Sequence, residues 1–215
     1  MDAKEIIARR VALELKEGDV VNLGIGLPTQ IPNYLPANVH ITIQSENGFL
    51  GMTQLVGEPM PSVVNAGGKP CGLALGAAVF DSATSFALIR GGHVDVTVLG
   101  GLEVDEKGNL ANWMVPGKMV PGMGGAMDLV TGAKKVIVAM EHCTKDGGAK
   151  ILKDCTLPLT AKERVSMVVT EMAVFMFEKG NFVLTELGPG ISLNDVENHT
   201  KAQFLISEKI GYMTI

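Results

Sequence analysis

The sequence is poor in charge, in cysteine and in aromatic residues, and each shortage excludes a class of protein. Only 19% of the 215 residues are charged, and the formal net charge is -5. A chain with this charge lacks the attraction to polyanions that dominates nucleic-acid binding, so we expect no nucleic-acid partner. The three cysteines, Cys71, Cys143 and Cys155, are odd in number and have no CxxC spacing. This pattern argues against a disulfide framework and a structural zinc site, and it fits a reducing cytoplasm.

Long apolar runs are also missing. No run approaches the length that spans a bilayer, and the N-terminus lacks the pattern of a signal peptide, so we expect a cytoplasmic protein without a membrane partner. Apolar residues nevertheless make up 47% of the chain, including 12 methionines. We therefore expect a single globular domain over residues 1–215, with part of its apolar surface buried against a partner.

Apolar periodicity predicts that helices and strands alternate. The first helix is expected over residues 3–17, where Ile7, Val11 and Leu15 form a stripe between an Asp2–Glu5 capping box and Gly18. Further strands are expected at 19–23, 39–44, 94–99 and 135–140, and helices at 30–35, 83–89 and 126–130. Apolar strands alternating with helices predict an α/β fold, a mostly parallel open sheet with helices on both faces. Segments 172–177 and 182–187 flank a turn and predict a small antiparallel C-terminal hairpin.

A glutamate follows the strand expected at 39–44. Ligands of open α/β sheets bind at the carboxyl ends of the strands, and the Asn47-Gly48 turn pair would direct Glu46 out of that edge. Taken alone, a glutamate at a strand end is more often a solvated loop residue or a cap than a catalytic group.

A run of glycines precedes the helix expected at 126–130. Gly122, Gly124 and Gly125 allow close backbone approach to a ligand, and free amides at a helix start can stabilise a developing oxyanion. The alternative interpretation is that the glycines only permit a tight loop.

A second glycine pair follows the first strand. Gly24 and Gly26 form a GxG, but Thr29 stands where a dinucleotide-binding fingerprint has its third glycine, so turn glycines are the simpler interpretation. Asn22 could orient a substrate carbonyl or could satisfy neighbouring backbone groups.

Three metal-ligating residue types are adjacent at Glu141-His142-Cys143. Consecutive side chains at a strand end diverge, and no HxxxH or CxxC completes a site, so we expect no metal.

Several of these motifs occur together in a recognisable order. The segment VNLGIGLP at 21–28, QSENG at 44–48 and ANWMVPGKMVPGMGGAMDLV at 111–130 resemble the β subunits of the family I 3-oxoacid coenzyme A transferases, which include the acetoacetate and butyrate-acetoacetate types. The resemblance extends over almost the whole chain. It implies the fold shared by CoA-transferases and ribose-phosphate isomerases.

The resemblance assigns roles to individual residues. It implies that Glu46 is the catalytic nucleophile and that the amide of Gly125, or of Gly124, helps to hold the oxyanion. The residues expected at the substrate and CoA site are Asn22, Gly24, Gly26, Asn47, Gly48 and Lys69. For Lys69, a solvated surface lysine is an alternative.

The resemblance also implies the reaction. CoA moves between an acyl-CoA and a free short-chain or 3-oxo carboxylic acid by ping-pong chemistry through a glutamyl-CoA thioester, so CoA is a substrate and no bound cofactor or metal is expected. The family's enzyme also contains a related α half, which implies an α subunit as partner, most simply in an α2β2 assembly. Two alternatives stay open: an acyl-CoA hydrolase on the same fold, and a sugar-phosphate isomerase or non-catalytic ligand-sensing domain on the same scaffold.

Overall fold

The computed structural model describes residues 1–117 and 123–215, arranged as an α/β fold. The helices are α1 (Ala3–Ala12), the 3-10 helix η1 (Leu27–Tyr34), α2 (Ser82–Arg90), α3 (Ala126–Gly132) and α4 (Leu193–His199). The strands are β1 (Val20–Leu23), β2 (Thr42–Ser45), β3 (Phe49–Thr53), β4 (Gly72–Val79), β5 (Val96–Leu99), β6 (Glu103–Asp105), β7 (Leu110–Ala111), β8 (Lys135–Ala139), β9 (Ile151–Leu152), β10 (Met167–Val169), β11 (Ala173–Glu178), β12 (Asn181–Leu187) and β13 (Leu205–Tyr212). None of the helices within these described ranges is long and apolar enough to cross a membrane.

Ten of the strands form one sheet in the order β13-β12-β11-β10-β8-β5-β1-β2-β3-β4. The five central strands, β10, β8, β5, β1 and β2, run parallel. Antiparallel strands extend the sheet on both sides of this centre. The parallel centre confirms the fold class predicted from the alternation of helices and strands.

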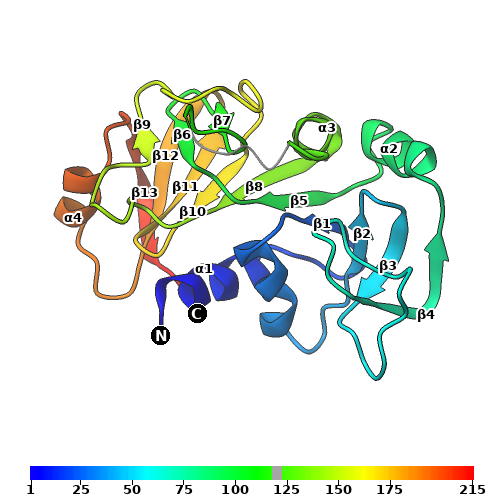
Figure 1. The fold of residues 1–215 in the computed structure, drawn as a ribbon. Coiled ribbons are helices and arrows are strands. Elements are labelled where there is room, and N and C mark those ends of the chain that lie inside the picture. Colours follow the sequence, from blue (N-terminus) through cyan, green and yellow to red (C-terminus); the bar gives the residue numbers. More distant parts are fainter. Residues whose placement is uncertain (118–122) are drawn as a thin grey trace.

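Helices cover both faces of the central strands. In Figure 1, α1 lies on one side of the sheet, and α2 and α3 lie on the other. Neighbouring strand residues accordingly enter different cores: Ile137 packs with Ile7 of α1, whereas Val138 packs with Ile89 of α2 and Leu129 of α3. Because successive side chains of a strand point to opposite faces, a strand buried on both faces is apolar throughout.

The first helix is shorter than predicted. It ends at Ala12, where the hydrogen bonds change from the helical pattern to tighter turns, the first of which joins Glu14 N–H to Val11 O. A second turn follows, in which Lys16 N–H donates to Asp19 Oδ2 at 2.8 Å, and the chain then enters β1. Asp2 caps the helix through Glu5 N–H as expected, but the Glu5 carboxylate pairs with Arg9. The predicted reciprocal capping box is therefore only half formed.

The C-terminal hairpin is confirmed but belongs to a larger sheet extension. Strands β11 and β12 pair antiparallel around Lys179 and Gly180, which both have positive φ, as a two-residue hairpin turn requires. Strand β10 adds on one side, and β13 adds in parallel on the other.

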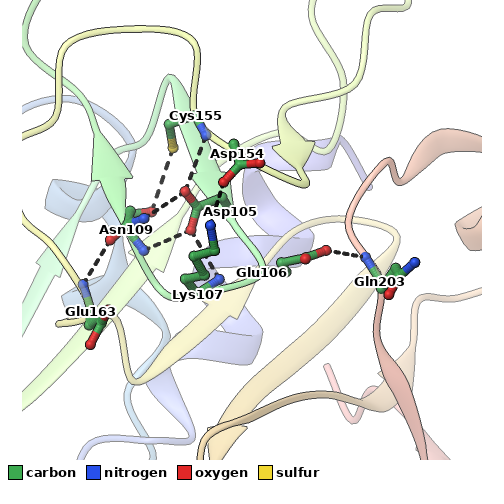
Figure 2. Close-up of polar contacts among 8 residues, drawn as sticks. All are labelled: Asp105, Glu106, Lys107, Asn109, Asp154, Cys155, Glu163 and Gln203. Carbon is green, nitrogen blue, oxygen red and sulfur yellow. Dashed lines mark hydrogen bonds and ion pairs between the residues drawn. The ribbon is translucent and has the colours of Figure 1, made fainter.

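A separate three-stranded sheet, in the order β7-β6-β9, is organised by one buried carboxylate. Asp105 is 1% exposed and accepts hydrogen bonds from the backbone N–H groups of Lys107, Asn109 and Cys155 and from the Asn109 side chain (Figure 2). A buried carboxylate that is satisfied by this many donors ties distant loops together. Asp105 therefore holds the β6–β7 turn against the loop that carries Cys155.

Candidate active site

Strand pairing brings Asn22 and Glu46 together. Strands β1 and β2 are parallel, with Asn22 opposite Gln44, and Glu46 follows β2 directly. Asn22 is 1% exposed, and its Nδ2 donates to Glu46 Oε2 at 3.3 Å. One Glu46 oxygen is therefore held at the sheet by Asn22. Because Glu46 is half-buried, its side chain remains partly accessible from the surface.

A tight turn fixes the direction of the chain after Glu46. Gly48 N–H donates to Ser45 O at 3.0 Å, and Ser45 Oγ donates to Asn47 Oδ1 at 2.6 Å. The Asn47 Nδ2 in turn donates to Val64 O. Gly48 has a φ of +117° and lies so close to Phe80 O that a Cβ would be 2.1 Å from it. Asn47 and Gly48 therefore build the turn that carries the nucleophile candidate, and a side chain at position 48 would disrupt it.

The glycine loop approaches Glu46 from α3. A Cβ at Gly125 would lie 3.3 Å from Glu46 Cγ and 3.4 Å from Phe86 Cζ, and one at Gly124 would lie 3.9 Å from Glu46 Oε1. Within the described part of the chain, neither the Gly124 nor the Gly125 amide donates a hydrogen bond. Gly122, which begins the predicted glycine run, lies outside the described residues. The structure therefore places Gly124 and Gly125 beside the Glu46 side chain that the sequence analysis selected.

Two buried polar residues behind this pair were missed from the sequence. Gln44 is 1% exposed, its Oε1 accepts from Asn22 Nδ2 at 2.8 Å, and its Nε2 donates to Ser85 Oγ at 2.9 Å. Ser85 of α2 is fully buried and donates to Ser45 O at 3.2 Å. A polar residue near the end of an otherwise apolar strand was the available signal for Gln44.

The remaining predicted site residues lie mostly around a groove of about 930 Å3. Lys69 and Gly26 line it, as does Ser45, but Glu46 is not among its lining residues. Lys69 is exposed, and its backbone N–H donates to Asn65 Oδ1 at 3.0 Å. Gly24 instead continues the β1–β5 pairing by donating to Val98 O at 2.8 Å. The groove opens beside the Glu46 turn, so Lys69 and Gly26 lie near Glu46 on a surface that a ligand could occupy.

The cysteines are poorly suited to act as nucleophiles. Burial raises the pKa of the Cys71 and Cys143 thiols, with Glu171 adding to the effect at Cys143. Burial and the nearby Asp105 carboxylate raise the pKa of Cys155 to about 12. Because the thiolate is the reactive form, none of the three thiols is activated at neutral pH.

His142 is occupied by structural hydrogen bonds. Its ring is fully buried, with Nδ1 2.9 Å from Thr170 Oγ1 and Nε2 3.0 Å from Thr200 Oγ1. Burial, reinforced by the positive charges of His199 and Lys150, lowers its pKa to about 4. His142 therefore stays neutral and joins the ends of β8, β10 and α4, and both ring nitrogens are engaged.

The chain is similar to known coenzyme A transferases. The family model described as coenzyme A transferase matches residues 4–198. The acetate CoA-transferase subunit beta of Haemophilus influenzae is 65% identical over 216 residues, which cover 100% of this chain and 97% of the relative. The subunit of the same name from Escherichia coli K12 is 66% identical over 211 residues, covering 98% of this chain and 97% of the relative.

A solved structure extends the likeness to the fold. An acyl-CoA transferase from Escherichia coli O157:H7 superposes with a TM-score of 0.80 at 23% identity, covering 99% of this chain and 43% of that longer chain. The same enzyme has also been solved in a thioester complex with CoA. Since the family model spans most of the chain and the relatives are similar over their full length, this chain belongs to the coenzyme A transferase family.

Proposed function

We propose that the chain is the catalytic β subunit of a CoA-transferase and that Glu46 is its nucleophile. The observation that carries the proposal is the position of the Glu46 carboxylate, which is anchored by Asn22 Nδ2 at 3.3 Å and packed against Gly124 and Gly125. A carboxylate becomes an effective nucleophile when it is oriented and partly removed from water. Both conditions are met by a half-buried side chain held at one oxygen.

The first half-reaction forms an anhydride. Glu46 attacks the thioester carbonyl of acyl-CoA, the C–S bond breaks, and CoA leaves as a thiolate. The tetrahedral oxyanion forms on the acyl group, and the Gly125 amide, with Gly124 as the alternative, is proposed to donate to it. One such donor contributes about 3 kcal/mol in comparable acyl-transfer sites.

The second step moves CoA onto the protein. The thiolate attacks the Glu46 carbonyl of the anhydride, which releases the first carboxylic acid and leaves a thioester between Glu46 and CoA. An acceptor carboxylate then reverses both steps and departs as the new acyl-CoA. Since the thioester bond is exchanged and never hydrolysed, no ATP is consumed and the kinetics are ping-pong.

The assembly is proposed to include an α subunit, most simply as α2β2. Two relatives that match over nearly their full length are named beta subunits, and this chain covers only 43% of the longer acyl-CoA transferase chain. Exposed apolar side chains also line the groove near Glu46: Ile25 is 72% exposed and Leu55 37%, and Val56, the neighbour of Leu55, is 91% exposed. Such a patch is typical of a surface that a partner covers.

Acetate is the proposed acid substrate to test first. Both relatives at about two thirds identity are named acetate CoA-transferases. Acetoacetate and butyrate, which the motifs also suggested, are the next acids to test.

A covalent trapping experiment tests the proposal. The chain, co-purified with its α subunit, is incubated with acetyl-CoA without acceptor acid and then treated with borohydride. The Glu46 thioester is far more electrophilic than a free carboxylate, so Glu46 should be reduced to the alcohol and activity lost only when acyl-CoA is present. Peptide mass spectrometry locates the reduced residue.

Two variants define the outcome. Glu46→Gln should show neither transfer nor labelling, whereas Glu178→Gln, an exposed glutamate at the end of β11, should behave like the wild type. Labelling at Cys71, Cys143 or Cys155 would contradict the mechanism. Hydrolysis of acyl-CoA to free CoA and the free acid, without transfer of CoA to an acceptor acid, would identify a hydrolase instead.

A further inference from the structure

We propose that Gln44 and Ser85 are positioning residues that fix the amide of Asn22 so that an N–H faces Glu46. This inference rests on the proposed function of Glu46. It extends the site from strands β1 and β2 into helix α2.

The orientation begins at a backbone carbonyl. Ser85 Oγ lies 3.2 Å from Ser45 O, which is an acceptor only, so the hydroxyl proton of Ser85 is directed there. Ser85 is fully buried. Its oxygen is therefore left as an acceptor for its other neighbour, Gln44.

That acceptor selects one of the two orientations of the Gln44 amide. Nε2 lies 2.9 Å from Ser85 Oγ, where a donor is needed, and this places Oε1 toward Asn22. The flipped amide would put two acceptors against each other at the Ser85 end and two donors against each other at the Asn22 end. In a fully buried site such contacts are costly, because no solvent compensates for the lost hydrogen bonds.

The orientation of Gln44 in turn fixes Asn22. Asn22 Nδ2 donates to Gln44 Oε1 at 2.8 Å, its shortest contact, and the same nitrogen lies 3.2 Å from the Gln44 backbone oxygen and 3.3 Å from Glu46 Oε2. Asn22 Oδ1 has no hydrogen-bond partner within the described part of the chain. The Nδ2 contacts are therefore what orients this amide, and a flip would set its oxygen against the Glu46 carboxylate.

The oxygen that faces Asn22 changes its charge during the reaction. When the CoA thiolate attacks the Glu46 carbonyl, negative charge develops on a Glu46 oxygen, and a donor already fixed beside it stabilises that charge without reorganisation. If Gln44 or Ser85 is lost, Asn22 Nδ2 loses its shortest fixed contact, and the amide is held only by the longer contacts to Gln44 O at 3.2 Å and to Glu46 Oε2 at 3.3 Å. The thioester should then form more slowly, while acyl-CoA binding should change little, because both side chains are buried.

Three variants of the assembly with α test this inference: Ser85→Ala, Gln44→Leu and the double variant. We expect kcat and the single-turnover rate of Glu46 thioester formation to fall by roughly 10- to 100-fold in Gln44→Leu and by roughly tenfold in Ser85→Ala. The KM for acyl-CoA should stay within about twofold in both. Since Ser85 acts through Gln44, the double variant should be no slower than Gln44→Leu alone.

The matched control is Ser82→Ala, the same substitution at an exposed position of α2, which should retain wild-type rates. Thermal unfolding of each assembly identifies variants that fail to fold, and Ser85→Ala, which removes a single oxygen, tests the inference if Gln44→Leu does not assemble. Wild-type thioester formation in Ser85→Ala, or additive losses in the double variant, would overturn the inference. Absence of any Glu46 thioester in the wild type would instead overturn the proposed function.

Discussion

The buried imidazole of His142 should make the stability of this chain depend on pH. The ring is fully buried between the hydroxyls of Thr170 and Thr200, and its pKa is lowered from 6.5 to about 4. The unfolded chain therefore binds a proton near pH 6.5, while the folded chain does not bind it until about pH 4. Stability contributed by the neutral ring is complete above pH 6.5 and is lost as the pH falls from 6.5 toward 4.

The magnitude follows from the two pKa values. A separation of this size corresponds to about 3 kcal/mol over the whole window. Between pH 7 and pH 5, about 2 kcal/mol of the free energy of unfolding is lost through this residue. For a chain of this length, that corresponds to a decrease in Tm of about 4 to 8 °C.

The assay compares the pH dependence of Tm between the wild type and His142→Gln. Glutamine retains polar groups but does not titrate, so the variant should lose about 4 to 8 °C less than the wild type between pH 7 and pH 5. The quantity compared is the change in Tm between pH 7 and pH 5 for each protein, so a loss of stability that the substitution causes equally at both pH values cancels. His40→Gln, at an exposed histidine beside Glu17, provides the control and should follow the wild type.

An equal decrease of Tm in His142→Gln and the wild type would refute this reasoning. It would mean that carboxylates or other groups account for the acid sensitivity and that His142 is protonated in the folded chain at pH 5.

Three further substitutions have defined outcomes. Gly125→Val would place side-chain atoms against Glu46, whose Cγ is 3.3 Å from the first added carbon. In steady-state assays it should reduce kcat roughly 100-fold, while the Tm of the assembly should stay nearly unchanged. At position 48 the φ is +117°, and Gly48→Ala would place a Cβ 2.1 Å from Phe80 O. The free energy of unfolding, measured in urea, should fall by at least about 2 kcal/mol. Wild-type stability would mean that the turn can rearrange. Asp105→Ala would leave buried donors without an acceptor and should cost about 3 kcal/mol, whereas Asp154→Ala, which removes an exposed ion pair, should change stability by less than about 0.5 kcal/mol.

Four of the five central strands were predicted from apolar segments of the sequence, whereas β10 (Met167–Val169), with only three residues, was missed. Segments 94–99 and 135–140 correspond to β5 (Val96–Leu99) and β8 (Lys135–Ala139), and every residue of β5 is buried. The edges were not predictable in the same way. Strand β4 reads GLALGAAV, with small residues and largely exposed side chains, so neither apolar alternation nor β-branched residues mark it as a strand. Strands β7 and β9 have two residues each, too few for any period to show.

The residues of the candidate site also differ in how far the sequence could predict them. Glu46 and the glycines could be selected because they follow a strand and precede a helix, and the motif resemblance gave them roles. The network of Gln44 and Ser85 could not, because it depends on which helix residue faces which strand residue across a distance of 41 positions in the chain. Lys69 and Gly26, which were expected at the substrate and CoA site, line the groove beside the Glu46 turn, and their role there stays a prediction.

The order of strands around the site has a consequence for folding. Strand β2, which presents Glu46, is an early segment, but β1 pairs on its other side with β5, and the glycine loop arrives only with α3 and β8. Each parallel neighbour requires closure of a long crossover, and such non-local contacts form slowly. Catalytic competence should therefore return late during refolding, after most helical signal has recovered. During synthesis, Glu46 leaves the ribosome long before Gly124 and Gly125, so the proposed site is assembled only after these later segments have been made.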